Sequence, residues 1–231
     1  MPALPRQSPF AMQQDQTRIA GVILAGGQGS RMHDRNKPLL PLAGKPMVQH
    51  VIDRARPQVD TLVISVNSVA PAYRQLGLPL VKDVDTARHG PLTGIFSVMQ
   101  WCHANASADL LVCFPADVPV FPENLVELLL SAGTGGIGAG EDRVSTGKTV
   151  IWCRTGEQVQ PLFSLWPINI LDELRQAVRQ GIHGPRLFFA SHPNLAITLP
   201  EPQPPLFQNI NTPEDLARAE TLLGPDVVDH G

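Results

Sequence analysis

The chain has 231 residues, a formal net charge of −3, 43% hydrophobic residues and 17% charged residues. The high apolar fraction and small net charge exclude an intrinsically disordered chain, and the mild acidity argues against a general nucleic-acid-binding protein, which would carry a basic surplus. The 23 prolines and 19 glycines are too many for a helical bundle and favour a fold rich in turns.

The first half of the chain alternates between predicted strands and predicted helices. Apolar runs typical of buried strands cover residues 18–25, 61–66, 78–81 and 109–114. Apolar residues at helical spacing predict helices over residues 45–56, 93–103 and 122–131. This alternation implies an α/β fold with three layers, in which a mainly parallel twisted sheet has helices on both faces.

The second half is less regular. Predicted strands cover residues 135–141, 148–154, 159–165 and 195–199, and predicted helices cover residues 167–180, 185–191 and 212–223. In the last helix, Asn211 is a candidate N-cap and Pro213 suits the first helical position. We expect residues 1–17 to be a flexible lead and residues 18–225 to form a single domain.

The cysteines and the apolar segments bear on the compartment. Cys102, Cys113 and Cys153 are far apart and surrounded by apolar residues, so we expect reduced core thiols rather than a disulfide framework or a zinc site. No run approaches the roughly 18 apolar residues of a membrane span, and the first residues lack the basic start and apolar core of a secretory signal. These features predict a cytoplasmic protein that binds neither membrane nor nucleic acid.

A glycine-rich loop follows the first predicted strand, in the sequence LAGGQGSRM, and Lys37 comes shortly after it. The stretch from Leu24 to Lys45 contains four basic residues and one acidic residue. Its net charge is therefore +3, and that of the remaining chain is −6. Glycines let backbone N–H groups approach a phosphate, and Arg31 and Lys37 add positive charge. Neither the P-loop motif nor the dinucleotide fingerprint fits, because Pro38 follows Lys37 and Met32 occupies the third glycine position. The loop therefore predicts an anion site of another kind, with a solvated surface loop as the alternative.

Two aspartates follow other predicted strands and should lie at the same edge of a parallel sheet. Asp117 lies in the sequence PADVP, where two prolines hold it in a rigid backbone, and Asp83 follows the strand at 78–81. Mg²⁺ binds one or two carboxylates together with phosphate oxygens and water, so Asp117 is the candidate metal ligand. The alternative for Asp117 is a turn or capping role, and for Asp83 the neighbouring Asp85 could serve as well. Together with the glycine loop, these residues predict a site for a nucleoside triphosphate with Mg²⁺.

At this point the motifs resemble a known family. The motifs concerned are LAGGQGSRM, Lys37 followed by PLLPLAGKPM, VISVN, GPLTG, PADVP and FQNINTPEDL. They are similar to motifs of the nucleotidyltransferases, and most of all to those of the molybdenum cofactor guanylyltransferases (MobA-type). The similarity is dense over residues 19–122 and returns at residues 207–216. It implies a Rossmann-like nucleotidyltransferase fold, with a nucleotide-binding half at about residues 18–132 and a substrate-binding half at about residues 133–225.

The resemblance implies that a terminal phosphate oxygen of molybdopterin attacks the α-phosphorus of GTP and that pyrophosphate leaves. It also implies transient contact with proteins that make and insert the molybdenum cofactor. Because the attacking group is already an anion, catalysis would rest on positioning and charge neutralisation. The implied catalytic residues are Lys37, Arg31 and Asp117, with Asp117 holding Mg²⁺. The implied nucleotide-binding residues are Leu24, Ala25, Gly26, Gly27, Gly29, Lys37, Asn67, Asp83 and Asp117. The implied substrate-binding residues are Asn209, Asn211, Gly90 and Gly94.

Some positions depart from the family. The stretch HDRN before Lys37 lacks the usual glycines and has Asn36 in the place of the usual aspartate, and Ser65 stands where some members have asparagine. Gly27 favours GTP, because relatives that use cytidine tend to read LAAG at this point. The alternatives are a cytidylyltransferase acting on the same cofactor, a transferase acting on a sugar phosphate, and a nucleotide-binding protein without catalysis.

Overall fold

The computed structural model describes residues 17–26, 37–84, 90–106, 108–133, 147–199 and 207–223. The predicted strand at 135–141 and almost all of the predicted lead fall outside these ranges, as do Gly27, Gly29 and Arg31. The division of the chain into a lead and a single two-part domain stays a prediction.

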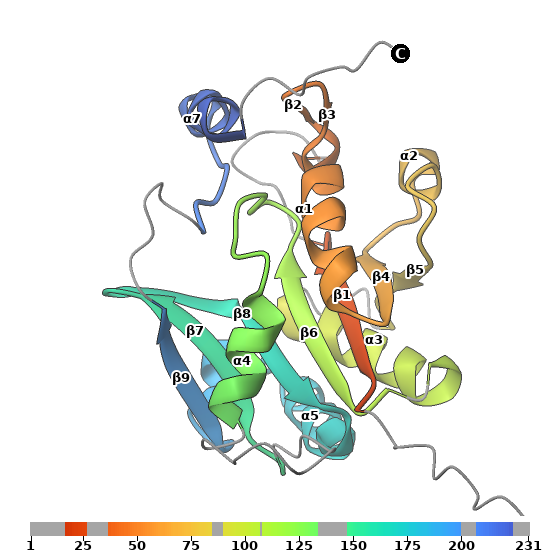
Figure 1. Cartoon of the computed structure of the whole chain (residues 1–231). Helices are drawn as coiled ribbons and strands as arrows, with labels where there is room; N and C mark the ends of the chain where they lie inside the picture. Colours follow the sequence, from red (N-terminus) through yellow and green to blue (C-terminus); the bar gives the residue numbers. More distant parts are fainter. Residues whose placement is uncertain are drawn as a thin grey trace, which may run out of the picture.

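A seven-stranded sheet with the order β5-β4-β1-β6-β8-β7-β9 forms the centre of the molecule (Figure 1). Four neighbouring strands run parallel, and β8 runs antiparallel to both β6 and β7, while β7 and β9 are parallel. The strands are β1 (Ile19–Leu24), β4 (Thr61–Val66), β5 (Leu80–Lys82), β6 (Leu110–Pro115), β7 (Val150–Thr155), β8 (Gln158–Pro167) and β9 (Asn194–Leu199). The prediction of a mainly parallel sheet is therefore confirmed. A separate antiparallel hairpin pairs β2 (Pro41–Leu42) with β3 (Lys45–Pro46).

Helices cover both faces of this sheet. In Figure 1, α1 and α4 lie in front of the strands, and α3 and α5 lie behind them. The α-helices are α1 (Met47–Ala55), α2 (Pro71–Arg74), α3 (Pro91–Asn105), α4 (Leu125–Gly133), α5 (Leu171–Arg179), α6 (Pro185–Phe189) and α7 (Pro213–Leu223). Short 3₁₀ turns are η1 (Lys37–Leu39), η2 (Arg56–Gln58) and η3 (Ile168–Ile170). None of the helices in the described ranges is long and apolar enough to cross a bilayer.

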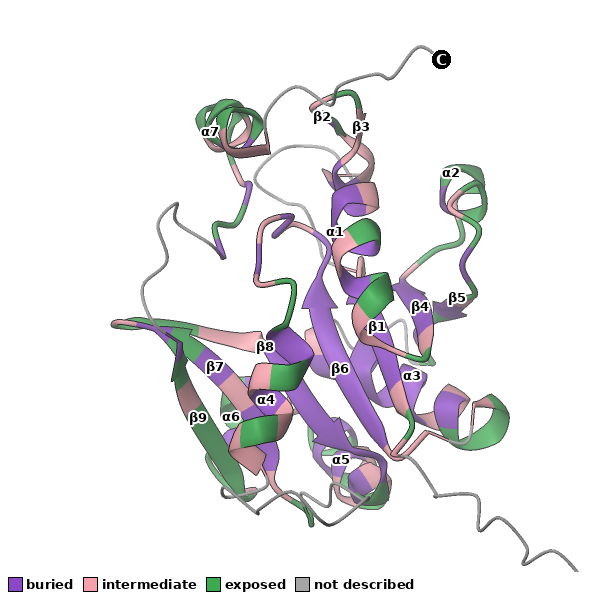
Figure 2. Cartoon of the chain, viewed as in Figure 1, coloured by how far each residue is buried: buried purple, intermediate pink, exposed green. Residues whose placement is uncertain are grey.

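The core consists of one apolar layer on each side of the sheet, because side chains alternate between the faces along each strand. On β1, Ile23 packs with Phe114 and Phe163 beneath α1 and α4, and Val22 packs with Met99 and Trp166 beneath α3 and α5. All six side chains are fully buried. Figure 2 shows the central strands buried, whereas α2 and β9 are largely exposed. The predicted buried runs at 18–25, 61–66 and 109–114 are thus strands covered on both faces, whereas the run at 78–81 is the edge strand β5, in which only Val81 is buried.

Several predicted boundaries were wrong by a few residues. The helix expected from residue 45 begins at Met47, because Lys45 and Pro46 pair with β2. The helix expected from residue 122 begins at Leu125. The helix expected over residues 167–180 begins later, because β8 extends to Pro167 and the turn η3 precedes α5.

The strand order determines where a ligand can bind. The chain passes from β1 to β4 on one side, then through β5 and α3 to β6 on the other side of β1. Parallel α/β sheets bind ligands beyond the carboxyl ends of their strands at such a reversal, because the loops from the two flanking strands diverge there. The loops after β1, β4, β5 and β6 all leave from this edge.

Candidate functional site

The first polar group at this edge is the lysine cluster, which consists of Lys37, Asp117 and Asn211. The Lys37 ammonium (Nζ) donates to Asp117 Oδ2 at 2.8 Å and to Asn211 Oδ1 at 2.7 Å. The side chains of Lys37 and Asp117 are 11% and 33% exposed. Three motifs separated by up to 174 residues therefore meet at one ammonium group. The sequence named all three residues but placed Asn211 near the acceptor substrate, not on the lysine.

The loop after β6 holds Asp117 in place through its neighbours. Ala116 N–H donates to the Leu24 carbonyl at 3.2 Å, which ties the loop to the end of β1. The Asp117 carbonyl accepts from Ile210 N–H at 3.0 Å. Further along, the Arg54 guanidinium of α1 donates to the Phe121 carbonyl at 2.8 Å. Asp117 is thus fixed by backbone bonds on both sides, in agreement with the rigid setting expected from its flanking prolines.

The start of α7 corrects one prediction. Asp215 N–H donates to Thr212 Oγ1 at 3.1 Å, and Asp215 Oδ2 accepts from the backbone N–H groups of Asn211 and Thr212 at 2.9 Å each. This reciprocal arrangement makes Thr212 the capping residue, so the expectation that the Asn211 side chain caps the helix was wrong. The pKa of Asp215 falls to about 2, first because of the bond from Asn211 N–H and then because of Arg218. Asn209 lies nearby and is exposed.

A second polar group, the serine cluster, consists of Ser65, Asp83 and Gly94. Ser65 Oγ donates to Asp83 Oδ1 at 3.0 Å, and the two residues are only 1% and 8% exposed. A Cβ on Gly94 of α3 would lie 2.7 Å from Ser65 Oγ. The packing therefore requires glycine at position 94. Ser65 was not among the predicted site residues, although a lone polar residue inside the apolar strand TLVISV could have indicated it.

The beginning of the glycine loop is attached to β4. Ala25 N–H donates to the Ser65 carbonyl at 3.0 Å, and the Asn67 side-chain amide donates to the Gly26 carbonyl at 2.6 Å. A Cβ on Gly26 would lie 2.6 Å from Asn67 Oδ1, so a larger residue does not fit there. Leu24, Ala25, Gly26 and Asn67 therefore lie together, and their contact with a nucleotide stays a prediction.

Gly90 has a packing role of its own. It precedes α3, and a Cβ at this position would lie 2.4 Å from the His183 carbonyl. The same carbonyl accepts from Leu92 N–H at 3.1 Å. Gly90 thus lets the segment between α5 and α6 approach the first turn of α3. Whether Gly90 and Gly94 also contact substrate stays a prediction.

The donor groups available at this edge suit one kind of metal. Within the described ranges, no group of three or more His, Cys, Asp or Glu side chains is placed to enclose an ion. The partly exposed carboxylate of Asp117 instead matches a hard divalent cation that completes its shell with phosphate oxygens and water. The thiols of Cys102, Cys113 and Cys153 are buried, and burial raises the pKa of Cys102 to about 11 and that of Cys153 to about 12. These thiols are core groups, as expected, and take no part in the site.

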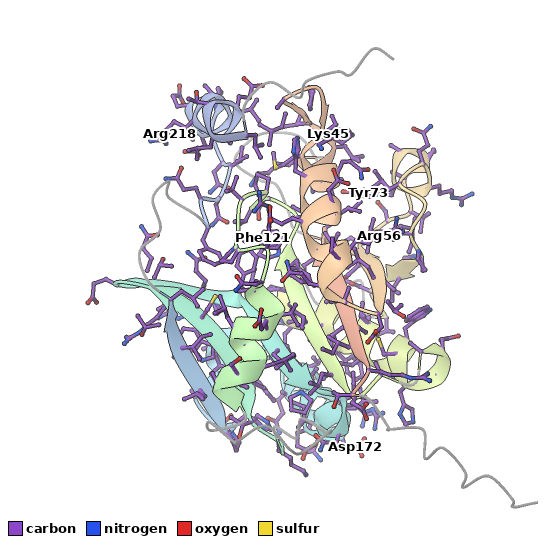
Figure 3. The ribbon with its side chains drawn as sticks, viewed as in Figure 1. Lys45, Arg56, Tyr73, Phe121, Asp172 and Arg218 are labelled. Atoms are coloured by element: carbon purple, nitrogen blue, oxygen red, sulfur yellow. The ribbon has the colours of Figure 1, made fainter. Side chains whose placement is uncertain are left out.

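The site lies toward one end of the molecule, where α7 packs against the β2–β3 hairpin and α1. Figure 3 shows Arg218 of α7 and Lys45 of β3 at one end of the molecule and Asp172 of α5 at the opposite end. A small, separate buried cluster lies at the end that carries α7. It consists of Leu42 of β2, Met47 of α1, Ile210 and Ala219 of α7. This apolar contact attaches α7 beside the lysine cluster.

Comparisons with known proteins identify the family and agree with the fold. Residues 21–195 match the family model described as the MobA-like NTP transferase domain. The molybdenum cofactor guanylyltransferase of Cereibacter sphaeroides is 37% identical over 209 residues, which cover 90% of this chain and 99% of that protein. The protein of the same name from Yersinia pestis (strain Pestoides F) is 34% identical over 200 residues, covering 87% and 94% of the two chains. Among solved structures, molybdopterin-guanine dinucleotide biosynthesis protein A from Archaeoglobus fulgidus has a TM-score of 0.67 at 21% identity, covering 89% of this chain and 98% of that one.

Proposed function

Since this chain belongs to the MobA-like NTP transferase family, we propose that this nucleotidyltransferase transfers GMP from GTP to the terminal phosphate of molybdopterin. An acceptor phosphate oxygen forms a bond to the α-phosphorus of GTP, the bond between the α-phosphorus and the bridging oxygen breaks, and pyrophosphate leaves. The product is the guanine dinucleotide form of the molybdenum cofactor. Relatives that bear this function in their names align over nearly their whole length with this chain, which supports the proposal.

The observation that carries the proposal is the lysine cluster. An ammonium group and a carboxylate lie 2.8 Å apart beyond the carboxyl ends of β1 and β6, next to the start of the glycine loop. The Lys37 ammonium can offset charge on the triphosphate, and Arg31 in the glycine loop would add to it. Because the acceptor phosphate is already an anion, no side chain has to remove a proton from it. Positioning and charge neutralisation then supply the catalysis.

The family uses a divalent metal, and we propose Mg²⁺ at Asp117. When bound there, the cation would neutralise charge that accumulates on the phosphate oxygens during transfer. Asp117 would hold it through a carboxylate oxygen. Since Lys37 already bonds to Oδ2 of that carboxylate, the lysine and the metal share one acidic group.

The remaining predicted residues are assigned by the same proposal. Around the nucleoside and its phosphates we place the residues of the glycine loop and the ends of β4 and β5, namely Leu24, Ala25, Gly26, Gly27, Gly29, Asn67 and Asp83. Near the acceptor we place Gly90, Gly94, Asn209 and Asn211. We further propose that the protein acts in the cytoplasm and transiently contacts the proteins that make and insert the cofactor.

A competition assay tests the nucleotide. A fluorescent GTP analogue is bound to the protein with Mg²⁺ present, and GTP, CTP and ATP are added in turn as competitors. We expect GTP to displace the analogue at the lowest concentration. Displacement by CTP at a lower concentration than by GTP would replace the guanylyltransferase by a cytidylyltransferase on the same fold.

A further inference from the structure

We infer that Asn211 is a positioning residue for Lys37, and that Asp215 at the start of α7 sets Asn211 for this task. This inference rests on the proposed function in one respect, namely that Lys37 contacts the triphosphate. It gives the C-terminal segment a role in nucleotide binding that is separate from any contact with molybdopterin.

The first support is the chemistry of the two acceptors on Lys37. Asp117 is a charged acceptor at 2.8 Å and Asn211 a neutral one at 2.7 Å. A second carboxylate would hold the ammonium as firmly but would cancel the charge that a phosphate needs. An amide oxygen instead fixes the geometry and leaves the positive charge available. Once Asp117 also engages a cation, Asn211 is the partner that keeps Lys37 in place.

The second support is how firmly Asn211 itself is held. Its backbone N–H donates to Asp215 Oδ2 at 2.9 Å, and the neighbouring Ile210 N–H donates to the Asp117 carbonyl at 3.0 Å. Ile210 is 1% exposed and packs with Met47 of α1. Because Thr212 does the capping of α7, the Asn211 side chain is not needed there and can face Lys37.

The third support is the backbone at the start of this segment. Phe207 is a buried, non-glycine residue with φ of 61°, a left-handed conformation that costs energy unless the surroundings fix it. Its N–H donates to the Val120 carbonyl at 2.8 Å, and its ring meets Phe163 edge-on at 4.8 Å between ring centroids. Two backbone bonds thus tie residues 207–211 to the loop that carries Asp117. A segment fixed in this way can hold a side chain against Lys37.

The test is a double-mutant cycle on phosphate binding in the absence of molybdopterin. Inorganic triphosphate and GTP are titrated calorimetrically into the wild type, Lys37→Ala, Asn211→Ala and the double variant. We expect Lys37→Ala to lower affinity by about 10- to 100-fold and Asn211→Ala by about 3- to 10-fold, from one lost charge-assisted bond and one lost neutral bond. The double variant should bind as Lys37→Ala does, because Asn211 acts only through the lysine.

Two further variants and a control sharpen the cycle. Asn211→Asp keeps an acceptor of the same size but neutralises Lys37, so it should lower affinity at least as much as Asn211→Ala, and most at low salt. Asp215→Asn should lower affinity by about 2- to 3-fold through weaker bonds to the Asn211 backbone. Asn105→Ala is the control, because Asn105 is an exposed asparagine in the last turn of α3, and it should leave affinity unchanged. Circular dichroism and thermal unfolding confirm that each variant is folded.

Kinetics separate this role from a contact with the acceptor. Under the inference, Asn211→Ala raises the KM for GTP, and any rise in the KM for molybdopterin beside it reports the separate contact with the acceptor that the proposed function assigns to Asn211. The inference is overturned if the two single effects multiply in the double variant, if Asn211→Ala binds triphosphate as the wild type does, or if only the KM for molybdopterin rises. Wild-type protein that binds inorganic triphosphate but prefers another nucleotide to GTP would refute the proposed function, and the cycle would still be decided on inorganic triphosphate. Wild type that binds neither probe would overturn both.

Discussion

The lysine cluster and the serine cluster lie at the same edge of one sheet and differ in nearly every physical respect. Lys37 begins the turn η1 and Asp117 lies in the loop after β6; both are partly open to solvent, and their interaction depends on charge. Ser65 of β4 and Asp83, which follows β5, are buried. Gly94 of α3 packs directly against Ser65 and leaves no room for a Cβ. The difference indicates that the first group can exchange its partners for a ligand, whereas Ser65 and Gly94 hold Asp83 in a fixed position at the site.

The largest expected effect falls on the lysine cluster. Asp117→Ala should lower the rate of nucleotidyl transfer by about 100-fold or more, because it removes the carboxylate that would hold the metal and leaves Lys37 without its charged partner. Its thermal stability should change little, since Asp117 is one-third exposed. The rate is followed by pyrophosphate release. Asp172→Ala, an exposed aspartate at the opposite end of the molecule, is the control. Normal turnover by a folded Asp117→Ala variant would end the metal role.

The second effect falls on the serine cluster and concerns stability. Gly94→Ala should destabilise the fold by about 1–3 kcal/mol, because the new Cβ overpacks a site that has no room to relax. That Cβ would lie 2.7 Å from Ser65 Oγ and 3.4 Å from Leu24 Cδ2. Urea unfolding measures the loss. The matched control is Gly184→Ala, since no atom lies within 4 Å of a Cβ at that position. Equal stability of the two variants would contradict the packing described for α3.

The third effect is smaller. Ser65→Ala should lower the free energy of unfolding by about 1 kcal/mol, because buried Asp83 loses a hydrogen-bond donor. Ser191→Ala, at an exposed position whose Oγ makes a long 3.4 Å bond to the Phe188 carbonyl, should have almost no effect. A Ser65→Ala variant as stable as the wild type would show that the Ser65 hydroxyl contributes nothing to the buried cluster.

The smallest effect concerns pH. Hydrogen bonds at the start of α7 lower the pKa of Asp215 from 3.8 to about 2. A depressed carboxyl pKa stabilises the fold above the unfolded value, and this stabilisation is lost as the pH falls through the folded value. Asp215 should therefore contribute to stability above about pH 4 and progressively less between pH 4 and 2. Asp215→Asn should unfold less steeply with acid over this window than the wild type does, and an identical acid profile would contradict the hydrogen bonds at the α7 cap.

The parts of this molecule that could be predicted from sequence are those whose cause is local. A short apolar run such as residues 61–66 favours a buried strand, and β4 has those bounds. Lys37 and Asp117 could be named because each follows a strand of a sheet that was expected to be parallel. Their meeting with Asn211 could not, since that contact spans 174 residues and depends on how α7 packs. Asn211 and Thr212 are both good capping residues, and only the bonds of Asp215 distinguish them.

The antiparallel strand β8 illustrates the same limit. Its sequence QVQPLFSLWP predicted only a shorter strand, over residues 159–165, and nothing in it revealed its direction or its place between β6 and β7. That place depends on Leu165 and Trp166 fitting the two core layers on opposite faces of the sheet. The polar residue Ser65 inside the apolar run TLVISV could have indicated a buried polar contact, but its partner Asp83 could not be identified before the fold was known.

The transfer reaction itself can be measured with the substrates that the proposal names. The purified protein is mixed with GTP, Mg²⁺ and molybdopterin, and both pyrophosphate and the pterin product are quantified. We predict one pyrophosphate released for each guanine dinucleotide formed, with neither detected when molybdopterin is left out. The absence of a guanine dinucleotide product from folded protein that binds GTP, or formation of a cytosine dinucleotide with CTP in its place, would contradict the proposed function.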